Sequence, residues 1–164
     1  MNREQLRDRL GEAVVEGQAS VPARQVLAEG AIGYLAMCGE GWPYAVPISY
    51  ALEGDTVFFH GGGSLKASLL EAEPRVCLAV TTRPEFLPAA DPCDENFRYE
   101  SVLVFGEVEL VADDAERHRA LRLIVQKYDA ALIHAPFRAG TLQGTSVWAL
   151  RVAALTYKRN PSAS

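Results

Sequence analysis

The sequence holds only three cysteines, and none of them stands in a CxxC pair. Cys38 and Cys77 lie inside apolar runs, so buried core thiols are favoured over redox or ligand roles, and Cys93 is expected at the surface. No apolar run approaches the about 18 residues that a membrane-spanning helix needs. The first residues, MNREQLRDRL, are too charged for a secretory signal. These absences predict a soluble, cytoplasmic protein with no membrane partner.

An excess of basic residues is also missing, because 21 acidic side chains against 16 basic ones leave a formal net charge of −5. Nucleic-acid binding usually needs a basic surface that displaces counterions from the phosphates. The charge balance therefore argues against a nucleic-acid partner. It does not exclude a small anionic ligand, because a pocket is governed by its local charge.

Motifs of several large enzyme classes are absent. A Walker phosphate loop needs Gly-Lys followed by Ser or Thr, whereas here Lys66 stands between Leu65 and an alanine. There is no GxGxxG dinucleotide fingerprint and no Gly-x-Ser-x-Gly nucleophile elbow. The histidines, His60, His118 and His134, show no metal-ligand spacing. The sequence therefore gives no support to nucleophilic hydrolysis and predicts no metal site.

What the chain does contain is a series of short apolar runs separated by turn residues. Its 164 residues suit one domain, residues 1–164, with an N-terminal helix within 1–20 and a frayed tail at 158–164. Six mainly antiparallel strands with helices outside them predict a mainly β fold, a small closed barrel with peripheral α-helices. Strands are expected at 31–38, 42–52, 56–60, 75–82, 100–112 and 145–157, and helices at 3–15, 22–29, 64–72 and 113–129.

Individual residues refine this prediction. Pro43 and Pro47 cannot donate to a strand ladder, so their strand is expected to lie at a sheet edge or to carry a bulge. Gly106 is a candidate bulge inside a long strand. Residues 83–99 show no periodicity, and we expect a long loop there that covers a pocket or a subunit interface.

The stretch FFHGGGSLKAS, residues 58–68, places three glycines and a lysine between an apolar strand and a helix. A glycine turn at a helix start exposes free backbone N–H groups near the positive end of the helix dipole. Ser64 adds a hydroxyl and Lys66 a full positive charge, so together they could hold one phosphate. The same residues fit a flexible connection with a solvated lysine, and a lone His60 fits a strand end bonded to backbone. This stretch by itself leaves both interpretations open.

Further motifs stand in order around this stretch: P-x-x-V-P at 43–47, F-F-H at 58–60, S-x-K at 64–66, E-P-R-V-C-L at 73–78 and Y-x-S-V-x-V-x-G at 99–106. Their order and spacing, over about residues 24–157, resemble the pyridoxamine 5′-phosphate oxidase-related superfamily of FMN-binding split barrels. Within it, F-H-G and the Y-x-S-V-x-V-x-G strand are similar to the nitroimidazole-resistance branch.

The resemblance implies a six-stranded antiparallel split β-barrel that forms a homodimer with two FMN sites at the interface. The flavin would lie along the strand from Val46 to Tyr50, and its phosphate would sit at the glycine turn. His60 would be the catalytic residue, next to the substrate. The cofactor-binding residues implied in this way are Val46, Pro47, Ile48, Ser49, His60, Gly61, Ser64, Leu65, Lys66 and Ser101.

The function implied by the resemblance is an FMN-dependent oxidoreductase with a small-molecule substrate, such as a nitro-aromatic compound reduced at the expense of a nicotinamide. His60 would orient or protonate the acceptor. Three alternatives stay open: a haem-binding or haem-degrading split barrel with His60 or His134 as axial ligand, a flavin-binding module without turnover, and a deazaflavin in place of FMN.

The chain departs from the vitamin B6 oxidase branch at the phosphate. Those oxidases carry Ser-Arg-Lys at the turn, where this chain has S-L-K at 64–66, and no earlier phosphate-neutralising arginine stands in the stretch AVPISY. Both departures argue against B6 oxidase activity. Arg75, Arg83, Arg98 or a residue of the partner chain could supply the missing charge.

Overall fold

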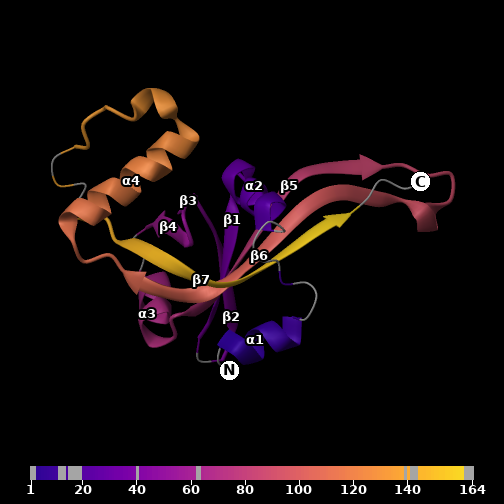
Figure 1. Ribbon diagram of the computed structural model, residues 1–164, viewed down its shortest axis with the longest axis horizontal. Coiled ribbons are helices and arrows are strands. Elements are labelled where there is room, and N and C mark those ends of the chain that lie inside the picture. The colour runs from indigo at the N-terminus through magenta and orange to yellow at the C-terminus, as the bar shows by residue number, and fades with distance from the viewer. Residues whose placement is uncertain are drawn as a thin grey trace.

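A computed structural model of the chain describes residues 3–10, 14, 20–39, 41–61, 64–138, 140 and 144–160. Within them lie four α-helices, seven β-strands and two short 3-10 segments (Figure 1). The helices are α1 (Arg3–Leu10), α2 (Val21–Glu29), α3 (Ser64–Ala72) and α4 (Asp114–Tyr128), and the 3-10 segments are η3 (Pro92–Asp94) and η4 (Ala130–Leu132). The strands are β1 (Gly33–Cys38), β2 (Pro43–Ile48), β3 (Tyr50–Glu53), β4 (Thr56–His60), β5 (Arg75–Leu87), β6 (Asn96–Leu110) and β7 (Val147–Asn160).

The strands form one antiparallel sheet in the order β2-β1-β5-β6-β7-β4-β3. The two edge strands, β2 and β3, follow each other in the chain and meet at Ser49. β2 pairs with β1 and β3 pairs with β4, so one bent segment joins both edges and curls the sheet into a half-barrel. The mainly β fold with peripheral helices is therefore confirmed.

The strand expected at 42–52 is divided in two, so the number of strands is seven rather than six. Pro47 lies opposite Tyr34 on the edge strand β2, where its missing N–H costs no ladder hydrogen bond. Ser49 then leaves the ladder, and the chain turns from β1 toward β4. The expected edge position of Pro43 and Pro47 is confirmed. The division itself leaves no mark in the sequence, because both halves are apolar.

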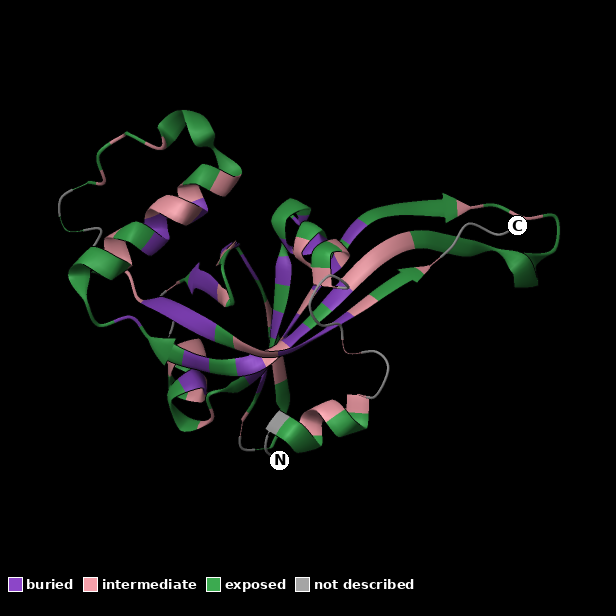
Figure 2. Ribbon diagram, in the orientation of Figure 1, coloured by how far each residue is buried: buried purple, intermediate pink, exposed green. Residues whose placement is uncertain are grey.

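The main core lies inside the curl of the sheet, and buried residues alternate with more exposed ones along much of β1, β5 and β6 (Figure 2). Leu35, Leu78 and Leu150 have no exposed surface there. Each fully buried leucine contributes about 2 kcal/mol by removing apolar area from water. The buried face of α2 joins this core, and α4 forms a second apolar cluster around Phe58 of β4.

Residues 83–99 form an extended arm rather than the expected loop. β5 continues to Leu87 and β6 begins at Asn96, so the two strands project together from the body of the molecule (Figure 1). A register shift between Thr82 and Glu85 marks the base of the arm, and Arg83 adopts a φ of 52° there. The sequence gives no periodic signal because a two-stranded ribbon in solvent has no buried face to impose one.

Gly106 lies at a bulge, as expected. The register between β6 and β7 shifts between Phe105 and Gly106, which leaves Ala153 as an extra residue on β7. A Cβ on Gly106 would stand 2.0 Å from the carbonyl oxygen of Arg151. Only glycine allows the two backbones to approach so closely.

The ends of the chain and the cysteines need small corrections. Val14 forms a bridge with Thr156 instead of continuing the first helix, and β7 continues to Asn160 because its last residues still pair with β6. Residues 161–164 of the expected tail lie outside the described residues.

Cys38 is exposed and Cys77 is half-buried, because both face the outer side of an apolar sheet, whereas Cys93 is exposed as expected. None of the described helices combines the length and the apolar character needed to cross a membrane.

Candidate functional site

The end of β4 and the start of α3 bring a histidine, a glycine and a lysine together. Gly61 follows His60 with a φ of 141°, and its N–H donates to the carbonyl oxygen of Ser146 at 3.1 Å. A Cβ on Gly61 would stand 2.4 Å from the Lys66 Nζ, so the absent side chain leaves the space that the ammonium uses. Gly62, Gly63 and the side chain of Ser64, which belong to the predicted phosphate-binding turn, lie outside the described residues.

Lys66 is a half-buried cation without a described carboxylate partner. Its Nζ donates a long hydrogen bond of 3.4 Å to the carbonyl oxygen of His60 and lies 5.8 Å from the centroid of the Phe59 ring. Burial lowers the pKa of Lys66 because the charged form loses hydration. No ion pair of Lys66 with an acidic side chain occurs within the described ranges. The ammonium is therefore available to an anion from outside the chain.

His60 stands beside this ammonium at the end of β4. The side chain is exposed, but neighbouring atoms partly desolvate the imidazole and lower its pKa, and the positive charge of Lys66 lowers the pKa further. Both causes act against the protonated form, so His60 is neutral at neutral pH. A neutral imidazole has one nitrogen that donates and one that accepts, which suits proton transfer to a bound molecule.

The titration of His60 gives a direct test of this pairing. In the ligand-free protein its pKa is expected to lie below the ordinary value of 6.5, and Lys66→Met is expected to raise it only part of the way, because burial is the larger cause. An NMR pH titration of the imidazole protons measures both proteins. Because the unfolded chain takes up the proton first, the stability that comes from neutral His60 is complete above pH 6.5 and is lost as the pH falls through the folded-state pKa. An unchanged titration in Lys66→Met would show that the two side chains do not interact.

The junction of β2 and β3 lies next to His60. Tyr50 of β3 pairs with Phe59 of β4, and this register brings Ser49 beside His60. Along β2 the side chains of Val46 and Ile48 turn toward the core, whereas those of Pro47 and Ser49 are exposed. The predicted flavin strand and the predicted phosphate turn therefore meet in the folded chain.

Two residues of α4 that the sequence did not single out hold this junction in place. The Tyr50 N–H donates to the Tyr128 hydroxyl at 3.1 Å, and the Tyr50 hydroxyl donates to the carbonyl oxygen of Leu27 at 2.8 Å. Lys127 donates to the same oxygen at 2.9 Å, and its Nζ lies 3.4 Å from the centroid of the Tyr50 ring. Burial lowers the pKa of Lys127 to about 8 and raises the pKa of Tyr50. No local signal could have shown these contacts, since they join residues far apart in the chain.

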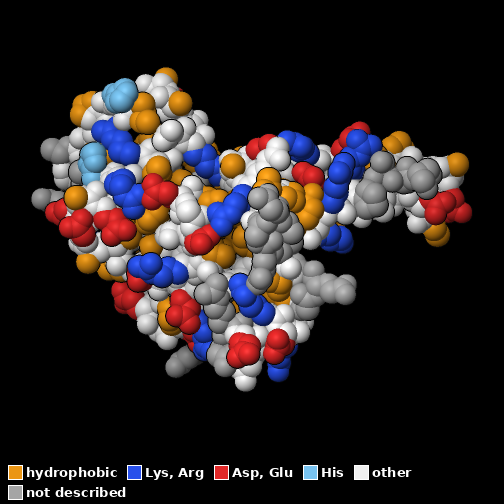
Figure 3. Space-filling view, viewed as in Figure 1, with side chains coloured by type: hydrophobic (Ala, Val, Ile, Leu, Met, Phe, Trp, Pro, Cys, Tyr) orange, Lys and Arg blue, Asp and Glu red, His pale blue; other side chains and the backbone are white. Residues whose placement is uncertain are grey.

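The other histidines lie away from this site. His118 belongs to α4 and packs edge-on against Phe137, with 5.2 Å between the ring centroids. His134 follows η4 and is exposed. In Figure 3 histidine side chains lie at the α4 end of the molecule, where basic and acidic side chains are mixed.

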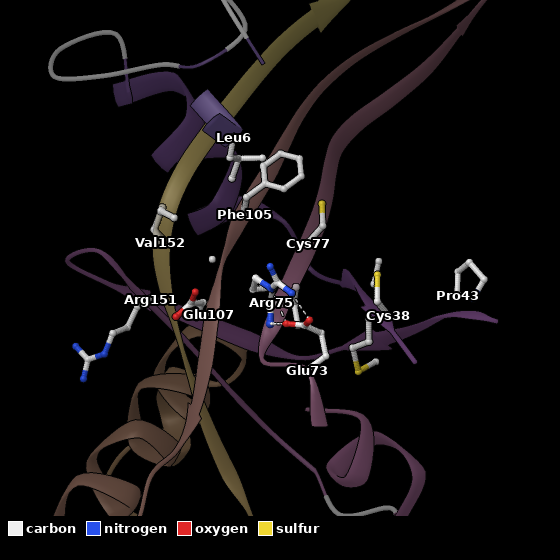
Figure 4. Close-up of a pocket in the computed structure, with 15 residues that line it drawn as sticks. Leu6, Cys38, Pro43, Glu73, Arg75, Cys77, Phe105, Glu107, Arg151 and Val152 are labelled. Atoms are coloured by element: carbon white, nitrogen blue, oxygen red, sulfur yellow. Dashed lines mark hydrogen bonds and ion pairs between the residues drawn. The ribbon is translucent and has the colours of Figure 1, made fainter. Parts of the chain in front are cut away.

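A hollow lies elsewhere, on the outer face of the sheet beside α1. Its volume is about 710 Å³, with Leu6, Phe105 and Val152 on its apolar side and the paired Glu73 and Arg75 on the other (Figure 4). It contains none of the predicted cofactor residues. The motif-bearing turn is the better candidate for the site of chemistry, because no histidine lines the hollow and its two arginines, Arg75 and Arg151, are paired with carboxylates.

Comparison with known proteins decides the family. The sequence model of the pyridoxamine 5′-phosphate oxidase family matches residues 22–159. The chain belongs to this family. The resemblance found in the sequence is thereby confirmed.

Several solved structures have a similar fold. A proposed 5-nitroimidazole antibiotic resistance protein from Bacteroides thetaiotaomicron has 24% identity and a TM-score of 0.72, over 88% of this chain and 84% of that one. A flavocytochrome from Azotobacter vinelandii has 23% identity and a TM-score of 0.74, over 93% and 72%. A FAD and heme binding protein from Mycobacterium smegmatis has 22% identity and a TM-score of 0.73, over 93% and 77%. No curated protein matches the chain.

One predicted residue of this family member does not reach the site within a single chain. Ser101 pairs with Lys158 of β7, whereas His60 pairs with Val147 of the same strand. The intervening residues of β7 span about 35 Å at roughly 3.3 Å per residue. Ser101 and His60 therefore lie near opposite ends of β7.

The three arginines considered as replacements for the missing phosphate ligand all have carboxylate partners. Arg75 pairs with Glu73 and Arg83 with Glu29, both at close range, while Arg98 pairs with Glu85 at 3.1 Å. None of the three lies in the turn with Lys66. Lys66 is therefore the cation that the described chain itself offers to a phosphate there.

Proposed function

We propose that this member of the pyridoxamine 5′-phosphate oxidase family is an FMN-dependent oxidoreductase with a small-molecule substrate. The observation that carries the proposal is the ammonium of Lys66, which lies over Gly61 at the start of α3 without a described acidic partner. A cation beside the free amides of a helix N-terminus fits a phosphate monoester. The residues present therefore fit the anionic end of FMN.

Each part of the site has a role in this proposal. Lys66 and the first amides of α3 would hold the phosphate, and the exposed backbone around Pro47 and Ser49 would lie along the ring system. When bound, FMN supplies redox chemistry between a donor such as a nicotinamide and an acceptor such as a nitro-aromatic compound. His60 is the catalytic residue: its neutral imidazole orients the acceptor and holds or gives a proton at a ring nitrogen.

The separation of Ser101 from His60 supports a homodimer with shared sites. The apolar outer face of the sheet exposes Tyr34 and Leu103, which flank Ala79 in one row across β1, β5 and β6. Monomeric proteins seldom leave such a continuous apolar surface in water. A two-fold partner that covers this face would bring its own Ser101 to the His60 end of the first subunit. Each site would then contain residues of both chains.

The visible spectrum of the purified protein tests the proposal first. The bands of oxidised flavin, present as isolated or after addition of FMN, are expected. A Soret band would instead indicate haem, with His60 or His134 as the ligand to replace next. A colourless protein that takes up no FMN would contradict the proposal. Stopped-flow mixing of the FMN-loaded protein with NADH or NADPH, with and without a nitro compound, then separates an enzyme from a flavin-binding module.

A further inference from the structure

The arm, residues 83–99, carries an uncovered aromatic pair. Phe86 and Phe97 face each other across the two strands, with ring centroids 5.3 Å apart, and are 48% and 50% exposed. The pairing of Glu85 with Arg98 lies next to them, and β7 stops at Asn160, opposite Tyr99. A two-stranded ribbon is marginally stable in water unless it packs against something. The arm therefore has the character of a surface that is covered in the assembled protein.

The aromatic pair shares a face with the residues that meet the partner in the proposed dimer. Side chains of a strand alternate between the two faces, so Phe97, Ser101 and Leu103 of β6 all point outward, opposite to buried Val104. Phe86 pairs with Phe97 and lies on the same face. The outer face of the sheet thus continues without interruption from Leu103 through Ser101 to the tip of the arm.

The position of the arm follows from the two-ended geometry. Ser101 lies at the base of the arm, and Phe97 lies about 13 Å farther out, at roughly 3.3 Å per residue. If the Ser101 end of one subunit meets the His60 end of the other, the arm must run past that site onto the partner. The backbone at Arg83, with its φ of 52° beside the register shift, sets the angle at which the arm leaves the body.

We propose that each arm lies over the flavin site of the partner subunit, where Phe86 and Phe97 form an apolar wall against a planar aromatic substrate. This inference rests on the proposed function and adds to it the element that contacts the aromatic substrate. The two rings are tilted by 58° to each other, so they offer the face of one ring and the edge of the other, and aromatic molecules pack favourably against both. The wall also keeps water from the flavin, and His60 faces it from the other side of the site.

Access of a solute to bound flavin tests the wall. In the FMN-loaded protein, the variant Phe86→Ser/Phe97→Ser is expected to raise the iodide quenching constant of flavin fluorescence by roughly three- to tenfold. Its dissociation constant for FMN is expected to stay within about twofold, because the pair does not touch the phosphate turn. The control Val21→Ser/Leu132→Ser removes side chains that are 55% and 52% exposed on α2 and η4, and is expected to change neither value. An unchanged quenching constant in the arm variant would overturn the proposed wall.

Cross-linking tests the position of the arm without relying on flavin. In a background carrying Cys38→Ser, Cys77→Ser and Cys93→Ser, Phe97→Cys is combined with Leu65→Cys in α3 or with Tyr128→Cys in α4, the two flanks of the site. A short bis-maleimide is expected to join two chains in at least one of these variants, but not when the second cysteine replaces Val21. Absence of both products would overturn the inference even if FMN binds. A protein that takes up no FMN but still cross-links would refute the proposed function and leave the docking of the arm in place.

Discussion

Lys66→Ala is expected to weaken the binding of FMN by roughly 10- to 150-fold, which corresponds to about 1.5–3 kcal/mol for one charge-assisted hydrogen bond. The ammonium of Lys66 lies in the space beside Gly61, and within the described residues no acidic side chain neutralises it. Titration of the ligand-free protein with FMN, followed by the change in flavin fluorescence, measures the affinity. Lys66→Arg, which keeps the charge but not the shape of the donor, is expected to fall between the two.

Riboflavin supplies the sharpest control for this result, because it has the ring system of FMN and no phosphate. Its affinity is expected to be equal in the wild type and in Lys66→Ala. Arg24→Ala removes a cation that is bound to Gly54 and Asp55 at the far turn of the β3–β4 hairpin, and is expected to leave both affinities unchanged. Equal loss of FMN and riboflavin binding in Lys66→Ala would show that the lysine supports the fold of the site and does not bind the phosphate.

Gly106→Ala is expected to lower the free energy of unfolding by about 3 kcal/mol, the upper part of the usual range for overpacking a core. The new methyl group would stand 2.0 Å from the carbonyl oxygen of Arg151 and 2.9 Å from a methyl carbon of Leu150. The first of these atoms belongs to backbone in the central β6–β7 pairing and cannot rotate away. The midpoint of thermal unfolding is expected to fall by roughly 6–12 °C for a chain of this size.

The matched control for that variant is Gly144→Ala. Apart from its chain neighbours, no atom of the described residues lies within 4 Å of the place where its Cβ would stand. Its midpoint of unfolding is therefore expected to stay close to that of the wild type in the same thermal scan. A Gly106→Ala protein as stable as this control would mean that the bulge at Ala153 relaxes to accept the methyl group.

The sequence predicted those parts of the fold that bury one face of an element. Alternation and turn residues placed β1, β4 and β7 within a few residues of their observed bounds, and the helical spacing did the same for α2 and α3. The arm at residues 83–99 was wrongly predicted as a loop, because its side chains are in solvent on both faces of the ribbon. Its sequence therefore shows no repeating apolar pattern. The break at Ser49 was not predicted, because the pairing of β2 and β3 with two different neighbours depends on the whole sheet and not on local sequence preference.

The candidate site divides in the same way. The glycine turn, His60 and Lys66 are close in sequence, so a local motif predicts that they lie together in space. The contacts of Lys127 and Tyr128 with the β2–β3 junction depend on how α4 packs, which no spacing in the sequence encodes. The distance between Ser101 and His60 has a similar origin, since it depends on the length of β7 and on which strands lie between them.

The bend at Ser49 has a mechanical consequence. β2 and β3 pair with strands at opposite edges of the sheet, and the bend between them links the two edges. The half-barrel would therefore open at this bend. Tyr128 supports the bend from one side, because its hydroxyl accepts a hydrogen bond from the Tyr50 N–H. A molecule bound beside Ser49 would support the bend from the other side. The stability of the half-barrel against opening would then increase with the occupancy of the site beside Ser49.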